Sequence, residues 1–161
     1  MKKFELFPTT VIEFDFTNHP EIPLLLNYIE QSNSHSHTLI KNGTSSYATD
    51  NVLFNPKFID LKNDIQKRID FYSRELNILP SIISKSWFNL MNTKGLTGVH
   101  HHGSSVISGA FYPLLEENTC NLCFKSPIYS SLNFESLTPS PNNHSNHFQK
   151  DVVINIKQIS Y

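Results

Sequence analysis

The first half of the chain carries short apolar patterns separated by polar stretches. Residues 4–7 and 11–16 alternate apolar with polar side chains, which predicts two half-buried strands. Apolar residues recur at helical spacing over 20–31 and again over about 56–76, so we expect two amphipathic helices. The second of these helices should lie across a sheet. The polar stretch 32–51 between them has no sustained period and predicts a surface loop.

The second half of the chain has a β-rich pattern. Four segments have the composition of strands and are joined by Gly, Asn, Ser and Pro residues: 82–91, 106–115, 122–124 and 152–159. The Ser-, Asn- and Pro-rich stretch 126–146 predicts a long loop. We expect one domain over 1–161, with strands and helices in 1–80 and the main β-structure in 81–161.

Composition narrows the function classes. Hydrophobic residues make up 39% of the chain and Phe supplies 12 aromatic side chains, enough for one hydrophobic core. Lys plus Arg number 13 against 14 Asp plus Glu, without a basic stripe, so nucleic-acid binding is not expected. No apolar run has the ~18 residues of a membrane span, and the N-terminus lacks a secretory pattern. We expect a cytoplasmic protein.

Three consecutive histidines are the strongest candidate for chemistry. On an extended strand His100 and His102 project from the same face, whereas His101 points away. Imidazole is a good ligand for iron, zinc, copper and nickel, and two histidines plus a carboxylate mark non-haem iron(II) oxygenases. The alternative is a polar turn at a strand end. Gly95 and Gly98 turn the chain into the histidines, an arrangement typical of a jelly roll.

The sequence around the histidines resembles a known enzyme family. The segments SWFN (86–89) and HHHGSSVISGAFY (100–112) are similar to the phage and bacterial 2-oxoglutarate/iron(II) oxygenases. The motif of that family runs His-x-His, then small residues, then Ser-Gly-x-Tyr-Tyr. The N-terminal part is similar too, so the resemblance covers nearly the whole chain. The positions that match the motif are His100, His102, Ser108, Gly109 and Tyr112.

The resemblance implies an α+β fold in which two N-terminal helices pack on a double-stranded β-helix, or jelly roll. It also implies Fe(II) and 2-oxoglutarate as cofactors, with decarboxylation of 2-oxoglutarate coupled to oxidation of a small-molecule or otherwise unknown substrate. Carried over, His100 and His102 bind the metal. His102 stands where many such oxygenases have Asp or Glu.

The chain departs from the family pattern at its C-terminus. A distal His and an Arg that binds the cosubstrate carboxylate have no match before Tyr161. We therefore expect a truncated, incomplete jelly roll, and a non-catalytic protein is the alternative. An unclosed sheet edge would favour pairing with a second copy. The candidate cosubstrate-binding residues are Asn89 at the pocket rim, Tyr112, and Lys125, whose ammonium could pair with a carboxylate.

A second constellation has the residue types of a zinc site. Cys120 and Cys123 could combine with His144 and His147 in a zinc-stabilised structural domain. Alternatively, Cys123 packs beneath the sheet as a small hydrophobic residue while Cys120 lies in a turn, both as reduced thiols. His144 or His147 could also supply a third ligand to the metal held by His100 and His102.

The remaining aromatic and imidazole side chains are assigned to ordinary roles. Trp87 lies in a predicted strand and is expected in the core, where most such aromatics are found. His19, His35 and His37 lie in predicted surface segments and are expected to be solvated.

Overall fold

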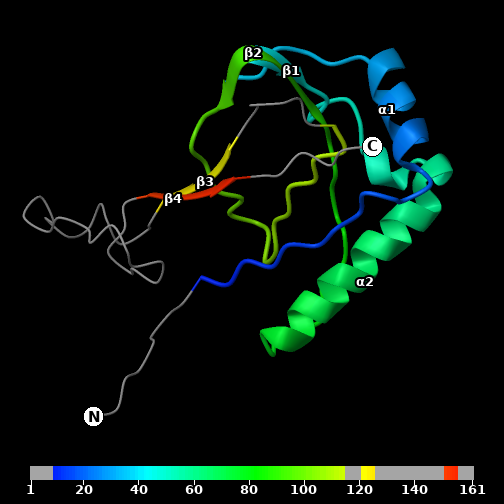
Figure 1. The fold of residues 1–161 in the computed structure, drawn as a ribbon, viewed down its shortest axis with the longest axis vertical. Helices are drawn as coiled ribbons and strands as arrows, with labels where there is room; N and C mark the ends of the chain where they lie inside the picture. The colour runs from blue at the N-terminus through cyan, green and yellow to red at the C-terminus, as the bar shows by residue number, and fades with distance from the viewer. Residues whose placement is uncertain (1–8, 115–120, 126–150, 156–161) are drawn as a thin grey trace, which may run out of the picture. The chain divides into compact units, whose positions relative to one another are not determined.

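The computed structural model describes residues 9–114, 121–125 and 151–155. Contacts divide the chain into two units, one of residues 12–113 and one that joins 1–11 to 114–161. The first unit contains helices α1 and α2 and strands β1 and β2, and the second contains strands β3 and β4 (Figure 1). Among the helices in these described residues, none is long and apolar enough to span a membrane.

Helix α1 (Ile22–Gln31) confirms the first predicted helix. Its buried residues Ile22, Leu25 and Ile29 follow the three- and four-residue spacing of one helix face. A proline lies in the first turn, where a missing backbone N–H costs no intrahelical hydrogen bond.

Helix α2 (Ile59–Glu75) confirms the second predicted helix and follows two short 3-10 turns, η1 (Val52–Phe54) and η2 (Pro56–Phe58). Its N-terminus is tied to α1, because the Leu61 N–H donates to Glu21 Oε2 at 2.7 Å. In the first unit, α2 packs against η1 and η2, and its Leu61 lies in the core with Leu25 and Ile29 of α1. That this helix lies across a sheet stays a prediction.

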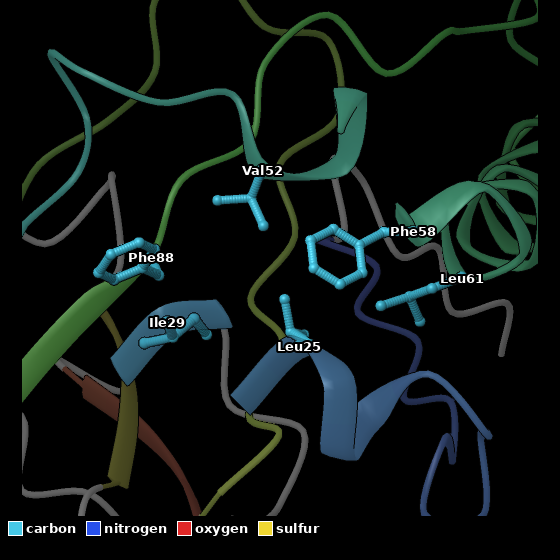
Figure 2. Packing of buried hydrophobic residues seen from close by; sticks show 6 residues of the cluster. All are labelled: Leu25, Ile29, Val52, Phe58, Leu61 and Phe88. Carbon is cyan, nitrogen blue, oxygen red and sulfur yellow. The ribbon is translucent and has the colours of Figure 1, made fainter. Parts of the chain in front are cut away.

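The hydrophobic core of the first unit lies between the two helices and the segment that enters β2 (Figure 2). Phe58 and Leu61 are fully buried, and each such side chain contributes about 1.5–3 kcal/mol of burial free energy. The core residues are Leu25, Ile29, Val52, Phe58, Leu61 and Phe88. Phe88 matters most for the site, because it fixes the start of β2 against α1 and η1.

Strand β1 (Ile40–Ser45) pairs antiparallel with β2 (Asn89–Thr97), and Figure 1 shows the two side by side. The register shifts between Lys41 and Gly43, which marks a bulge. The bulge needs glycine at Gly95, because a Cβ there would lie 2.7 Å from the carbonyl oxygen of Asn92.

Two expectations for the N-terminal half are wrong. Residues 32–51 are not only a loop, because β1 lies within them. Residues 11–16 form no strand in the structure, although their exposure alternates as predicted. The alternation arises from packing against α2, where the Phe14 ring meets the Phe71 ring edge-on at 5.9 Å between centroids.

The predicted strands of the second half are partly confirmed. Strand β3 (Asn121–Lys125) pairs antiparallel with β4 (Asp151–Asn155), as expected for 122–124 and for the described part of 152–159. The strand predicted at 82–91 is wrong in extent, because β2 begins only at Asn89. The strand predicted at 106–115 is wrong over its described residues, since 106–114 contain no strand. The predicted strand 4–7 and the predicted loop 126–146 lie outside the described residues.

Candidate metal centre

His100 and His102 lie just beyond the end of β2 and their rings are in contact. The ring centroids are 4.9 Å apart and the ring planes are nearly perpendicular, at 88°. His100 and His101 are exposed and His102 is half-buried. Residues 98–102 form no strand, so the strand predicted here is absent, but the first and third rings lie together. That the pair binds a metal stays a prediction.

Gly98 anchors this pair to the sheet. Its backbone N–H donates to the carbonyl oxygen of Leu39 at 2.6 Å, and its own carbonyl oxygen lies 2.8 Å from Nδ1 of His100. A carbonyl oxygen can only accept, so this contact requires the proton of neutral His100 on Nδ1. The Nε2 lone pair is then free to bind a metal, as in most metal-ligating histidines.

Trp87 flanks the other member of the pair. Its ring centroid lies 5.5 Å from that of His102 and 5.0 Å from that of Tyr47. Trp87 is half-buried and lies outside the core cluster, so the expectation that it fills the core is wrong. Its neighbour Phe88 takes the core position, and successive side chains of an extended segment point to opposite sides.

Tyr47 and Trp87 are held in place by the residues next to them. The Ser46 N–H donates to the Phe88 carbonyl oxygen at 3.0 Å, and the Phe88 N–H donates to Ser46 Oγ at 3.1 Å. Ser46 is fully buried. This reciprocal pair fixes the backbone from which both aromatic rings project. Tyr47 was missed in the sequence analysis, because only the long-range pairing of β1 with β2 brings it beside Trp87.

Ser86 fixes the segment on the other side of Trp87. Its hydroxyl donates to Asn51 Oδ1 at 2.9 Å and accepts from the Leu53 N–H at 2.8 Å, and its N–H donates to the same Asn51 oxygen at 2.9 Å. The entry into β2 is therefore tied to η1 by a small polar network.

The candidate cosubstrate residues lie in different parts of the molecule. Asn89 is the first residue of β2 and its Oδ1 accepts from Ser45 Oγ at 2.7 Å. Tyr112 is half-buried in the first unit. Lys125 is exposed at the end of β3, in the second unit. Their predicted contacts with 2-oxoglutarate stay predictions.

The described residues contain two neighbouring candidate ligands but no larger set. Among them, no group of three or more His, Cys, Asp or Glu side chains is arranged to hold a metal ion. The segments that build the site, 31–49 and 77–114, contain no Asp or Glu at all. A carboxylate completing a facial triad with His100 and His102 therefore cannot come from these segments.

Of the four residues of the predicted zinc site, the structure describes Cys123 alone. Cys123 is a free, exposed thiol on β3, so the expectation that it packs beneath the sheet is wrong. Cys120, His144 and His147 lie outside the described residues. The zinc-stabilised domain stays a prediction.

The three other histidines of the first unit differ in environment. The His19 side chain is only 7% exposed, so the expectation that it is solvated is wrong. Its Nδ1 accepts from the Glu21 N–H at 3.2 Å and its Nε2 lies 3.5 Å from Asp64 Oδ2. His35 is exposed as expected, whereas His37 is half-buried, with its ring centroid 5.7 Å from that of Tyr47.

The segment that contains the three consecutive histidines is similar to a known protein family. Residues 85–159 match the family model described as "Putative 2OG-Fe(II) oxygenase". The match covers slightly less than half of the chain, and over these residues the chain is similar to that family. The matched oxygenase segment begins before Trp87 and includes His100, His102 and strands β2, β3 and β4. Neither a search of curated proteins nor a search of solved structures gave a match.

Proposed function

We propose that the protein is an iron(II)- and 2-oxoglutarate-dependent oxygenase in which His100 and His102 hold the metal. The observation that carries the proposal is the contact between the two imidazoles, 4.9 Å between centroids, within the segment that matches the oxygenase family. The double-stranded β-helix belongs to the same proposal, since mixed helices and antiparallel strands are compatible with that fold.

The donor atoms suit the metal. Neutral imidazole is a common ligand of iron(II), and the hydrogen bond from His100 to Gly98 selects the tautomer whose Nε2 can coordinate. Trp87 packs against His102 and shields one side of that ring from water. When bound, iron(II) with 2-oxoglutarate and dioxygen supplies oxidation: 2-oxoglutarate becomes succinate and carbon dioxide, and one oxygen atom passes to the substrate.

A third protein ligand would come from outside the described residues. His144 and His147 are the candidates from the sequence, and either would give a three-histidine site in place of the usual carboxylate. For the cosubstrate we propose Asn89, Tyr112 and Lys125, with the Lys125 ammonium opposite a carboxylate group.

The test is turnover of 2-oxoglutarate by the full chain. Purified protein is incubated with iron(II), ascorbate, oxygen and 2-oxoglutarate, and succinate is quantified for the parent, His102→Ala and His101→Ala. We expect succinate from the parent and from His101→Ala, which removes an exposed imidazole outside the proposed ligand pair, and none above background from His102→Ala. Equal succinate from all three proteins would contradict the proposal.

A measurement of bound metal separates the alternatives. If the parent binds iron(II) but forms no succinate, with or without candidate substrates, the protein is a non-catalytic relative. The zinc-stabilised domain predicts a different result. His102→Ala would then retain zinc and unfold when the zinc is removed, whereas Cys123→Ala would no longer bind zinc.

A further inference from the structure

Two aromatic rings beside the proposed metal ligands form a corner on the surface. The rings of Tyr47 and Trp87 are perpendicular, at 90°, with centroids 5.0 Å apart. A flat ring laid against one of them meets the other edge-to-face, and both arrangements are favourable for aromatic groups. Tyr47 is 41% exposed and Trp87 is half-buried, so part of each ring faces solvent.

The backbone that carries both rings is held by hydrogen bonds in the absence of a ligand. Each ring is adjacent in sequence to a member of the buried pair Ser46 and Phe88, whose two hydrogen bonds join the segments. A preformed surface loses little conformational entropy on binding. Such a surface is better suited to ligand recognition than a mobile aromatic side chain.

A positive charge lies at the same place. The Lys85 Nζ atom is 3.6 Å from the centroid of the Tyr47 ring. Within the described residues, no carboxylate forms a salt bridge with Lys85.

The charge near the corner is positive overall. Segments 31–50 and 77–114 contain three lysines, Lys41, Lys85 and Lys94, and one carboxylate, Asp50, which accepts from the Tyr28 hydroxyl. Their formal charge is therefore +2 in a chain whose net charge is −1, which leaves −3 on all other residues. A site built from these segments favours an anion.

We infer that the protein binds a substrate that combines a flat ring with a phosphate or carboxylate group. The ring stacks in the corner of Tyr47 and Trp87, beside His102, and the anionic group pairs with Lys85. This inference rests on the proposed function, because the bound ring is interpreted as part of a substrate that lies next to the proposed metal. 2-Oxoglutarate is also an anion, but it has no ring, so the aromatic corner separates the two ligands.

The inference is tested by titrating the full chain with matched probes. Binding is measured by calorimetry and by the fluorescence emission of Trp87, the single tryptophan. Thymidine monophosphate and benzoate each carry a ring and an anion. Thymidine carries the ring alone, and deoxyribose phosphate carries the anion alone. We expect one or both of the complete probes to bind at least about tenfold more tightly than thymidine or deoxyribose phosphate.

Variants assign the binding to the corner. Tyr47→Ala should weaken the bound probe about tenfold, whereas Tyr47→Phe should retain it because the ring remains. Lys85→Gln should weaken it and reduce its dependence on salt. Lys41→Gln, which removes the same charge from an exposed position of β1, should have little effect.

Three results would overturn the inference: neither complete probe binds, deoxyribose phosphate binds as tightly as thymidine monophosphate, or Tyr47→Ala has no effect. Competition by 2-oxoglutarate that depends on Lys85 would also overturn it, since the lysine would then serve the cosubstrate. Each titration is repeated with and without a divalent metal. If the protein takes up no metal but binds a probe in a way that depends on Tyr47, the proposed function is contradicted and the inference of an aromatic site is supported. If the protein takes up metal but binds no probe, the inference is contradicted and the proposed function is unaffected.

Discussion

The Nδ1 atom of His100 lies 2.8 Å from the carbonyl oxygen of Gly98, two residues earlier in the chain. The Gly98 N–H donates to the carbonyl oxygen of Leu39, so the exposed imidazole is hydrogen-bonded to backbone that is itself tied to the residue before β1. We predict that neutral His100 carries its proton on Nδ1 in the metal-free protein. Nitrogen NMR of the histidine side chains measures this directly, and a proton on Nε2 would contradict the proposed ligand orientation.

Trp87 should report metal binding at His102. It is the single tryptophan of the chain, and its ring centroid is 5.5 Å from that of His102. A paramagnetic ion such as cobalt(II) bound there should quench most of the tryptophan emission. We expect quenching in the parent and in His101→Ala but not in His102→Ala. Identical quenching curves for the parent and His102→Ala would mean that the ion binds elsewhere.

Ser86 should matter for stability, whereas its near neighbour Ser84 should not. Ser86→Ala removes the hydroxyl that accepts from the Leu53 N–H and donates to Asn51, and should cost about 1–3 kcal/mol of unfolding free energy. Ser84 is exposed, so Ser84→Ala should change stability by less than about 0.5 kcal/mol. Urea unfolding of the two variants decides the point, and equal midpoints would contradict the network.

Asp64 should contribute to the acid sensitivity of α2. The Lys67 ammonium, 2.6 Å from Asp64 Oδ1, holds the pKa of this carboxyl below its ordinary value of 3.8. A lowered pKa in the folded state favours folding while the carboxylate is charged. The contribution is therefore present above pH 3.8 and is lost as the pH falls through the lower folded-state pKa.

The variant Asp64→Asn tests this sign. Its unfolding free energy, followed from neutral pH to below pH 3.8, should fall less steeply than that of the parent. Lys67→Met should flatten the curve in the same way, because it removes the partner that lowers the pKa. A steeper acid loss in either variant would show that the sign is wrong.

The two helices were predictable from sequence because their apolar residues follow helical spacing over two turns or more. Strand β1 was not, because its sequence IKNGTS is polar and has no alternation. It becomes a strand through pairing with β2, whose first residue Asn89 is 44 positions from Ser45. Residues 11–16 show the opposite case, since their alternation arises from packing on a helix.

The candidate site was predictable only in part. The spacing of His100 and His102 was enough to expect neighbouring imidazoles, which the structure shows. The role of Trp87 was not predictable, because Trp87 and Phe88 are both large and apolar. An extended segment can bury only one of them on a given side, and the sequence does not say which. The position of Phe88 beside Val52 and Ile29 decides it (Figure 2).

The most direct test of the metal assignment is an anaerobic titration of the full chain with iron(II) and then 2-oxoglutarate. The signal is the visible charge-transfer absorption of the chelated cosubstrate. The account predicts this band in the parent and in His101→Ala, and its loss in His102→Ala. A parent protein without the band, or a band of equal intensity in His102→Ala, would contradict the assignment of His100 and His102 as the metal ligands.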